Sequence, residues 1–457
     1  MIRSERVLPL NRRQIPADRP YVLYWMQSAQ RAASNHALEY AVRQANLLRK
    51  PLLAYFGISE RFPEANERHY RFMLEGLRET RTELEKRGIR LLIRRVSPET
   101  GARELAAFAA LVVVDRGYLR VERAWRDTLA DGADCPVIQV ETNVVVPVQT
   151  ASSKEEYSAA TFRPKILRVR DLFAQALQEE KVLVPSLGLN PSPDMFELSD
   201  IDAALGLLNI DRSVGSAGTR GGTVEARRLL RVFLLEKLAG YGDMKNDPGG
   251  DLTSGLSPYL HFGQISPLDI MLDLSDAPAA QREAFLEELV VRRELSMNFV
   301  FFNPQYDAYE SLPAWARATL EKHGSDLRPY IYTRDELENA RTHDPYWNAA
   351  QSEMVLTGRM HGYMRMYWGK KILEWGRTPQ EAYSTALWLN NRYSLDGRDP
   401  NAFAGVAWCF GKHDRPWGER DVFGNVRYMN AKGLERKFNM RQYLQRVALL
   451  NTGVPES

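Results

Sequence analysis

Short apolar runs alternate with longer amphipathic stretches over the first third of the chain. The apolar runs predict buried strands at 21–26, 51–57, 89–94, 110–115 and 136–140. Between them, helical periodicity with charged outer faces predicts helices at 35–48, 66–87, 100–109 and 119–131. This alternation is typical of an α/β domain with a parallel, doubly wound, Rossmann-like sheet.

An open sheet of this kind usually binds a ligand at the carboxyl ends of its strands. The sequence does not identify that ligand, because neither the dinucleotide-binding motif G-x-G-x-x-G nor the phosphate-binding motif G-x-x-x-x-G-K-[ST] is present. A scaffold with an empty crevice therefore stays open as an alternative.

The second half of the chain has a different pattern. Dense Pro, Gly and Ser predict a linker over 183–222. Helical patterns then follow at 223–239, 259–274, 279–301, 332–341, 348–375 and 378–391, and one weak strand is expected at 421–430. We therefore expect an N-terminal α/β domain at 1–182 and an all-α C-terminal domain at 223–457.

Composition narrows the class of protein. The chain has 457 residues, 44% apolar and 26% charged, which is typical of a folded protein with large cores. Only two cysteines occur, far apart, so we expect no disulfide framework and a cytoplasmic location. No secretory h-region or membrane-spanning stretch is evident. The net charge of +3 argues neither for nor against a nucleic-acid partner.

Common catalytic motifs are missing from the chain. The seven histidines form no H-E-x-x-H pair and no zinc-type spacing, and no G-x-S-x-G elbow occurs. A hydrolase or a metalloenzyme is therefore weakly supported, and we expect no metal.

Tryptophan placement is unusual. Six of the nine tryptophans fall between Trp347 and Trp417. Trp368 and Trp375 lie seven residues apart on one predicted helix, so they share a face at roughly 10 Å separation. The pair either packs into a core or forms part of a chain of oxidisable indoles.

Two polar segments could hold a ligand. The run Thr253, Ser254, Gly255, Leu256 and Ser257 precedes a predicted helix, where hydroxyls and free N–H groups suit a phosphate. An ordinary helix N-cap is the alternative. The loop-like run 390–401 lies between apolar segments, so its polar groups suit either a buried heterocycle or a solvated loop.

A basic and aromatic segment near the C-terminus fits nucleic acid, since cations bind phosphates and flat rings stack on bases. Its members are Trp408, Lys412, Arg415, Trp417, Arg420, Phe423, Arg427, Tyr428, Lys432, Arg436, Lys437, Phe438 and Arg441. A solvated basic face is the alternative, because four acidic residues dilute the segment.

Together these stretches resemble the photolyase/cryptochrome superfamily, specifically its class II cyclobutane pyrimidine dimer photolyases. The resemblance rests on Leu-Ser-Pro-Tyr-Leu-His-Phe-Gly-Gln-Ile-Ser (256–266), Met-His-Gly-Tyr-Met-Arg-Met-Tyr-Trp (360–368) and the runs 24–31, 285–295, 370–375 and 391–401. It implies an N-terminal antenna domain, a connecting segment and a helical domain that holds FAD in a bent form.

The resemblance also implies residue roles around the flavin. Tyr241 and the segment Thr253–Ser257 match the phosphate-binding segment, and Arg365 and Asp396 match an ion pair beside the isoalloxazine ring. Asn390 is the first candidate for the asparagine near flavin N5, and Asn401 is the second. The implied electron chain is Trp368 next to the flavin, then Trp347, then Trp375 at the surface.

For the DNA, the resemblance implies that Glu288 faces the pyrimidine edges of the lesion. Met366 and Trp408 would line the lesion pocket, and Arg415, Trp417 and Arg427 would lie nearer the strand. Arg292 occupies a position where some relatives present a tryptophan, so a clamp of two tryptophans is not assumed.

The implied activity is a light-driven lyase acting on UV-damaged DNA. Fully reduced FAD (FADH⁻), excited by near-UV or blue light, would donate an electron to a flipped-out cyclobutane dimer and take it back after ring splitting. A cryptochrome-like photoreceptor and a (6-4) photoproduct photolyase are the alternatives. A deazaflavin or folate antenna chromophore is open, and we expect a monomer.

Overall fold

A computed structural model describes residues 2–191 and 194–451 of the chain. One sheet organises its N-terminal part, in the strand order β1-β6-β5-β2-β3-β4. The strands are β1 (Val7–Pro9), β2 (Tyr21–Trp25), β3 (Leu52–Gly57), β4 (Arg90–Arg94), β5 (Ala109–Asp115) and β6 (Val137–Val140). The five predicted parallel strands are thus present; β1, antiparallel to β6, is too short to be predicted from its pattern.

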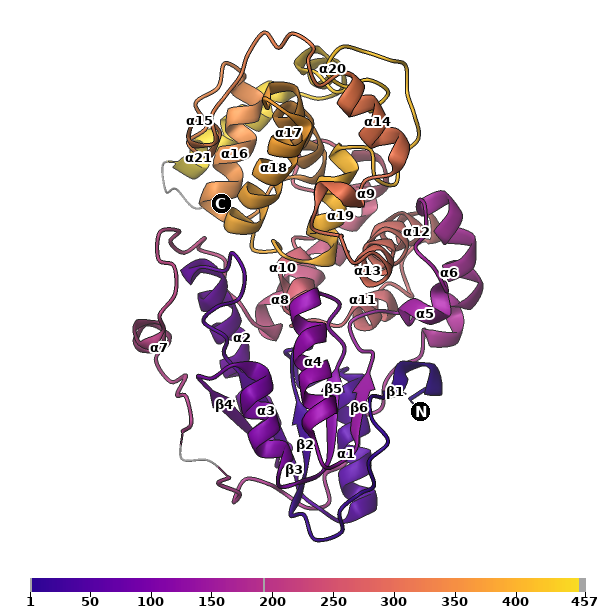
Figure 1. Cartoon of the computed structure of the whole chain (residues 1–457), viewed down its shortest axis with the longest axis vertical. Helices are drawn as coiled ribbons and strands as arrows, with labels where there is room; N and C mark the ends of the chain where they lie inside the picture. Colours follow the sequence, from indigo (N-terminus) through magenta and orange to yellow (C-terminus); the bar gives the residue numbers. More distant parts are fainter. Residues whose placement is uncertain (1, 192–193, 452–457) are drawn as a thin grey trace.

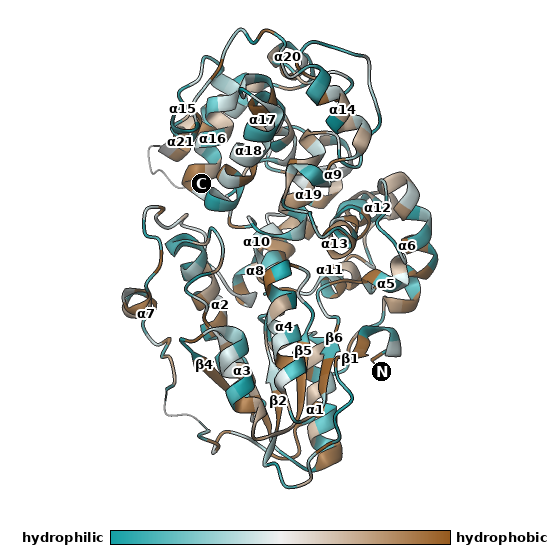
Figure 2. Cartoon of the chain, viewed as in Figure 1, coloured by the Kyte–Doolittle hydropathy of each residue, from teal (hydrophilic) through white to brown (hydrophobic). Residues whose placement is uncertain are grey.

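Helices cover both faces of this sheet (Figures 1 and 2). They are α1 (His36–Leu48), α2 (Glu67–Lys86), α3 (Pro98–Ala106) and α4 (Arg120–Gly132). Alternate residues of β2 face opposite cores: Val22 and Tyr24 pack with α1 and α2, whereas Leu23 and Trp25 pack with α3 and α4. Burial on both faces explains why the strands are apolar throughout.

The strand order reverses at β2, which has β5 on one side and β3 on the other. At the carboxyl end of β5, the Asp115 carboxylate accepts hydrogen bonds from the backbone N–H groups of Gln27, Ser28 and Ala29 at 2.7–2.9 Å. These bonds hold the loop after β2 at the sheet edge where ligands of such folds bind.

The segment after the sheet lies against the helical part. It forms α5 (Val148–Ala151) and α6 (Ala159–Phe173), and Phe162 and Ile166 of α6 pack with Phe233 and Phe285. The predicted linker then follows the surface of the N-terminal part, and it contains a short helix that the composition did not predict, α7 (Ile201–Leu207).

The described remainder of the chain is helical. Its α-helices are α8 (Thr223–Val232), α9 (Leu238–Met244), α10 (Ser257–His261), α11 (Pro267–Asp273), α12 (Ala279–Leu286), α13 (Arg293–Phe302), α14 (Ala314–Lys322), α15 (Arg334–Glu338), α16 (Pro345–Thr357), α17 (Gly362–Trp375), α18 (Pro379–Tyr393), α19 (Pro400–Cys409), α20 (Ala431–Lys437) and α21 (Met440–Asn451). Two π-helical turns, Phe233–Lys237 and Glu287–Arg292, join α8 to α9 and α12 to α13.

Three predicted elements were wrong in detail. The helix expected at 259–274 is split into α10 and α11, and the one at 348–375 into α16 and α17, where Gly358 takes a left-handed conformation (φ 69°). The expected strand at 421–430 is absent: that segment forms turns with one isolated bridge between Arg420 and Gly424.

Buried polar contacts join the two parts of the molecule. The Arg68 guanidinium of α2 donates to the carbonyl oxygens of Met354 and Tyr393 at 3.3 and 2.8 Å. Gly263 approaches the loop after β2 so closely that a Cβ would lie 1.9 Å from the Ser28 carbonyl oxygen. Within the described residues, no helix is long and apolar enough to cross a membrane.

Candidate functional site

Three buried tryptophans form a contiguous chain on α16 and α17. The ring of Trp347 stacks parallel to Trp368 with centroids 6.4 Å apart, and it meets Trp375 edge-on at 5.6 Å. The indole N–H of Trp347 donates to the Trp368 carbonyl oxygen, and that of Trp368 donates to Gln351 Oε1 at 2.9 Å. Trp347 therefore bridges the two tryptophans that share α17.

The expected surface position of Trp375 is wrong. Its side chain is 2% exposed, because Tyr332 and His343 cover it with ring centroids at 5.3 and 5.4 Å. The Tyr332 hydroxyl and His343 Nδ1 are hydrogen-bonded at 2.7 Å, and the exposed Tyr330 stacks on His343. Aromatic contact thus continues from Trp375 to the surface through Tyr332 and His343, which lie in non-helical segments on either side of α15 (Arg334–Glu338).

An ion pair connects α17 to the loop before α19. Arg365 Nη2 lies 3.1 Å from Asp396 Oδ1. Burial alone would raise the pKa of Asp396, but the charge and hydrogen bonds of Arg365, with the Ser257 hydroxyl, bring it below its usual value. Asp396 is therefore ionised at neutral pH, and the pair is fixed.

Buried polar atoms without a hydrogen-bond partner occur in the same part of the chain, on α17, on α18 and in the loop that follows α18. Asn390 on α18 is fully buried, and its Oδ1 has no partner among the described residues. Arg365 Nε and the Ser394 hydroxyl are also buried without a hydrogen-bond partner among the described residues. Asn401, by contrast, accepts a hydrogen bond from the Ser296 hydroxyl. Orphaned groups of this kind are costly unless a ligand or water meets them.

The segment Thr253–Ser257 leads into α10 beside these groups. Gly255 has φ 69°, and an added Cβ would lie 3.0 Å from the guanidinium of Arg359. Arg359, which the sequence pattern did not single out, therefore adds a cation beside this segment. Tyr241 lies on α9 and packs edge-on against Phe233 and Phe285, in the same apolar cluster as Leu256 of the segment.

The predicted lesion residues gather where α12, α13 and α19 meet. Glu288 and Arg292 lie in the π-helical turn, and the Arg292 guanidinium lies over the Trp408 ring at 5.5 Å. The Met366 carbonyl oxygen contacts the Cys409 thiol, so α17 adjoins the same place. Short π-helical turns within α-helices, such as Glu287–Arg292, occur frequently at functional sites.

Three residues of the basic and aromatic segment form a cluster in the turns after α19. Trp417 is 41% exposed, and the guanidinium groups of Arg415 and Arg427 lie over its ring at 5.4 and 5.0 Å. We call Arg415, Trp417 and Arg427 the Trp417 cluster. It presents two cations and one flat ring to solvent.

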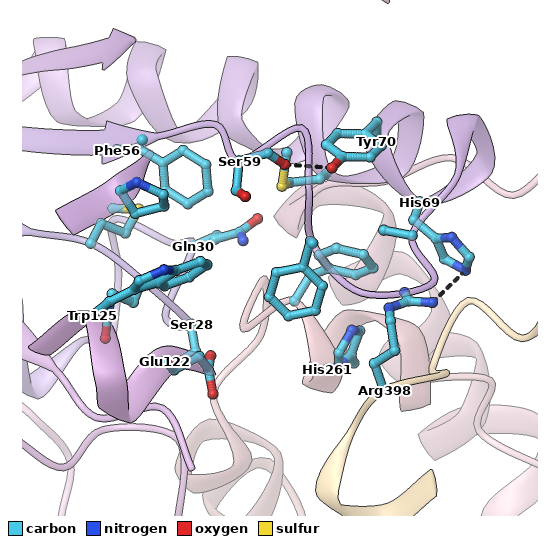
Figure 3. Close-up of a pocket in the computed structure, with 18 of the residues that line it drawn as sticks. Ser28, Gln30, Phe56, Ser59, His69, Tyr70, Glu122, Trp125, His261 and Arg398 are labelled. Atoms are coloured by element: carbon cyan, nitrogen blue, oxygen red, sulfur yellow. Dashed lines mark hydrogen bonds between the residues drawn. The ribbon is translucent and has the colours of Figure 1, made fainter. Parts of the chain in front are cut away.

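A separate pocket lies at the carboxyl edge of the sheet (Figure 3). Aromatic and apolar side chains dominate its lining, and a few polar groups converge on it. The lining includes Met26, Gln27, Ser28, Gln30, Phe56, Ser59, Phe62, His69, Tyr70, Glu122, Trp125, His261 and Arg398. Burial raises the pKa of Glu122 to about 7.

This pocket agrees with the location expected for a ligand of an open sheet. Its lining comes from segments after four strands and from the helical part, so no local motif could have revealed it. Among the described residues, no group of His, Cys, Asp and Glu side chains is arranged to hold a metal ion.

Comparison with known proteins places these features in a family. Residues 22–183 match the family described as DNA photolyase. The chain is 52% identical over 447 residues to the deoxyribodipyrimidine photo-lyase of Methanothermobacter thermautotrophicus, covering 98% of this chain and 99% of the relative. It is 38% identical to that of Potorous tridactylus, covering 93% and 81%.

A solved structure has the same fold. The archaeal photolyase of Sulfolobus tokodaii, solved with two FAD molecules, superposes with a TM-score of 0.70 at 15% identity. The superposition covers 94% of this chain and 92% of that one.

Proposed function

The chain belongs to the photolyase/cryptochrome family, and we propose from this premise how its residues bind a flavin and a damaged DNA strand. It acts as a deoxyribodipyrimidine photo-lyase, a flavoprotein that repairs cyclobutane pyrimidine dimers. The observation that carries this conclusion is the 52% identity to an archaeal enzyme of that activity over nearly the full length of both chains. The relatives favour it over a cryptochrome-like photoreceptor or a (6-4) photolyase.

We propose that FAD occupies the space around Asn390, Arg365 and Asp396. The orphaned buried Asn390 Oδ1 supports this, because it suits an N–H donor of a heterocycle. For this reason we favour Asn390 over Asn401, whose amide already has the Ser296 partner.

The phosphates would lie along Thr253–Ser257, where Arg359 adds a cation beside Gly255. Tyr241 would belong to the wall of the same region. It shares an apolar cluster with Leu256 of that segment, and burial together with the nearby Glu288 carboxylate raises the pKa of its hydroxyl, so it would adjoin both the phosphate segment and the lesion residues.

FAD held by these residues would supply the light-driven, reversible one-electron donor that the splitting of the dimer needs. The chain's own tasks are to bind, orient and exclude water. The Arg365–Asp396 pair would fix the ring's orientation and provide positive charge beside it.

Trp375, Trp347 and Trp368 would carry electrons inward to restore the reduced flavin. Their ring contacts at 5.6 and 6.4 Å support this order. Trp368 would be nearest the flavin, since it shares α17 with Arg365.

Glu288 would face the pyrimidine edges of the flipped-out dimer, between Arg292 and the wall formed by Met366 and Trp408. A flipped base is read through hydrogen bonds to its edge and stacking on its faces, which these residue types supply. The Trp417 cluster would contact the DNA strand beside the lesion.

An antenna chromophore would bind in the pocket at the sheet edge. Trp125 and Phe62 pack edge-on at 6.1 Å there and suit a flat ring system, while Arg398 suits an anionic group. A deazaflavin and a folate both fit this chemistry. Replacing Trp125 by Ala should remove a second absorbing species from purified protein while FAD content stays unchanged.

We propose that residues 1–182 form the antenna domain, 183–222 the connecting segment and 223–457 the catalytic domain. We also propose a cytoplasmic monomer that acts on cellular DNA. A single species of about 52 kDa in sedimentation would agree with the monomer.

The lesion assignment is tested with chemically reduced protein, blue light and oligonucleotides that carry either a cyclobutane dimer or a (6-4) photoproduct. The wild type should repair only the dimer. Glu288→Ala should lower the dimer repair yield by about tenfold or more with FAD content unchanged. An unchanged yield would remove Glu288 from the lesion site, and repair of the (6-4) product would change the substrate class.

A further inference from the structure

His323 lies between two carboxylates that come from different segments of the chain. It follows α14, and its Nδ1 is 2.6 Å from Asp326 Oδ2 in the same loop. Its Nε2 is 3.0 Å from Glu419 Oε1, in the turns after α19. A neutral imidazole has one N–H and can donate to only one of these oxygens, whereas the imidazolium donates to both. The geometry therefore suits the charged ring.

The groups around His323 favour its protonated form. The hydrogen bonds to Glu419 and Asp326 raise the pKa of His323 above its usual value, and burial opposes this rise only in part. Two cations share these carboxylates: Lys322 of α14 pairs with Glu419 at 2.5 Å. Arg328 donates to the Asp326 carbonyl oxygen at 3.0 Å. More of the ring thus stays protonated at neutral pH than in a free histidine, and the proton leaves as the pH rises further.

Both carboxylates also belong to the attachment of the turns that carry the Trp417 cluster. Asp326 Oδ2 accepts a hydrogen bond from the Val422 N–H at 2.9 Å. Glu419 lies two residues after Trp417 in the sequence. His323 is therefore joined to the backbone of these turns through Asp326, and to the segment beside the exposed tryptophan through Glu419.

The conformation of Val422 shows that this backbone is held in place by its surroundings. Its φ of 65° is left-handed, which is a rare conformation for a β-branched residue. The side chain is buried in the same apolar cluster as Phe423 and Val426. An unfavourable conformation of this kind persists only where neighbouring contacts impose it. The hydrogen bond to Asp326 is one of those contacts.

An uncharged attachment holds the same turns at a second point. The Asn425 N–H donates to the Thr319 hydroxyl of α14 at 2.9 Å, and Asn425 Nδ2 donates to the Trp417 carbonyl oxygen at 2.9 Å. Neither bond depends on pH, so the turns stay beside α14 when His323 loses its proton. Deprotonation should therefore loosen the turns locally without unfolding them.

We propose that His323 is a positioning residue for DNA binding: its imidazolium holds Asp326 and Glu419, and thereby fixes the turns that present the Trp417 cluster to the strand. The proposal rests on the DNA contact proposed above for this cluster. In the neutral ring, one carboxylate faces a nitrogen lone pair in place of a donor, so that contact opens. The affinity for DNA should then be highest at low pH and fall as the pH rises through the pKa of His323.

The test measures binding of the FAD-loaded protein to dimer-containing DNA, in darkness and at constant salt, between pH 6 and 9. The wild-type affinity should fall by about fivefold over this range, the scale of one lost hydrogen bond to a charged group. His323→Gln carries no charge and should bind at the weaker level throughout. His323→Arg keeps its charge and should bind at the stronger level throughout.

Asp326→Ala separates positioning from net charge. This variant gains one positive charge, which by itself favours DNA, but it loses the acceptor for Val422 and His323. We expect it to bind as weakly as His323→Gln at pH 6. Asp202→Ala makes the same change of charge on α7, where Asp202 is 79% exposed, and it should not weaken binding. FAD content and thermal unfolding check the folding of each variant.

Two results would overturn the proposal: a His323→Gln variant that follows the wild-type pH profile, or an Asp326→Ala variant that binds as tightly as Asp202→Ala. Failure of the proposed DNA contact has a different signature, because Arg427→Ala would then bind as the wild type does. A loss of affinity in Arg427→Ala, combined with either of the two results above, would refute the role of His323 alone.

Discussion

Trp347 is the residue that makes the tryptophan chain continuous. Trp368 and Trp375 share one helix at a separation of roughly 10 Å. Trp347, from α16, contacts both with ring centroids at 6.4 and 5.6 Å, so two short steps replace one long step. The sequence spacing alone could not show this, because the bridging ring comes from another helix.

We predict that Trp347→Phe and Trp375→Phe slow photoreduction of the oxidised flavin by at least about tenfold, because each removes one of three oxidisable rings that contact one another in series. Repair by chemically reduced protein should be unchanged. Photoreduction is followed by loss of the oxidised-flavin absorbance under blue light with a thiol donor.

Trp388→Phe is the matched control. This tryptophan lies on α18, and the guanidinium groups of Arg334 and Arg392 lie over its ring. Among the described residues, its ring contacts none of the three tryptophans of the electron chain. It should photoreduce at the wild-type rate. Normal rates in the Trp347 and Trp375 variants would refute the assigned path.

At the scale of elements, periodicity located most helices but not their interruptions. The apolar pattern runs through 348–375, whereas the backbone ends α16 at Gly358 and begins α17 four residues later. The segments that cover Trp375 and carry the Trp417 cluster are turns, whose positions depend on tertiary contacts rather than on a repeating pattern. This is why the strand at 421–430 and the exposure of Trp375 were mispredicted.

The first turn of α4 contains a carboxyl group that should make stability depend on pH. Glu122 accepts a hydrogen bond from the Leu119 N–H, and burial raises its pKa to about 7. The folded protein therefore keeps a proton that the unfolded chain releases near pH 4.3. Raising the pH from 5 to 8 should cost the folded state on the order of 3 kcal/mol from this group.

Glu122→Gln cannot ionise and should lack this loss. Urea unfolding at pH 5, 6, 7 and 8 gives the free energy of unfolding of the wild type and of the variant. The difference between the two should grow with pH. Glu67→Gln, in the first turn of α2, is the control for removing a charge at a helix start. A constant difference across this range would show that Glu122 is ionised in the folded protein.

The Trp417 cluster should act as a cationic element on DNA. We predict that Arg427→Ala weakens binding of dimer-containing DNA several-fold and reduces the slope of log K against log salt by about 1. Arg334→Ala removes an arginine that lies over Trp388 at 5.1 Å and should change neither quantity. If Arg427→Ala leaves both the affinity and the slope intact, the DNA path lies elsewhere.

For the whole molecule, the contact between the two parts positions the site. Arg68 of α2 reaches into the helical part and donates to the carbonyl oxygens of Gly215, Met354, Val355 and Tyr393. Asn390 and Asp396, which we propose contact the flavin, lie on either side of the acceptor Tyr393 in sequence. The sheet and the catalytic helices are therefore joined beside the cofactor's proposed place.

We predict that Arg68→Leu lowers the free energy of unfolding by about 2–4 kcal/mol, because it leaves several buried carbonyl groups without donors. Thermal unfolding measures the loss. Arg71→Leu, one turn further along α2, removes an arginine whose partner Asp202 is exposed, and it should cost about 1 kcal/mol or less. Equal losses in both variants would contradict a special role for Arg68.

Sequence patterns were sufficient for the fold class, whereas the flavin and lesion residues came from the resemblance of continuous runs to a family, and their roles stay predictions. The same patterns did not single out Arg359 or the lining of the sheet-edge pocket. Both arise only where distant segments meet: the loop before α17 with Gly255, and four strand ends with the helical part.

The central claim is that reduced flavin and light together drive the repair. The most direct measurement follows loss of a cyclobutane dimer from an oligonucleotide with chemically reduced protein, in blue light and in darkness. We predict complete, catalytic loss of the dimer in light and none in darkness. Repair in darkness, or no repair in light by flavin-containing reduced protein, would contradict it.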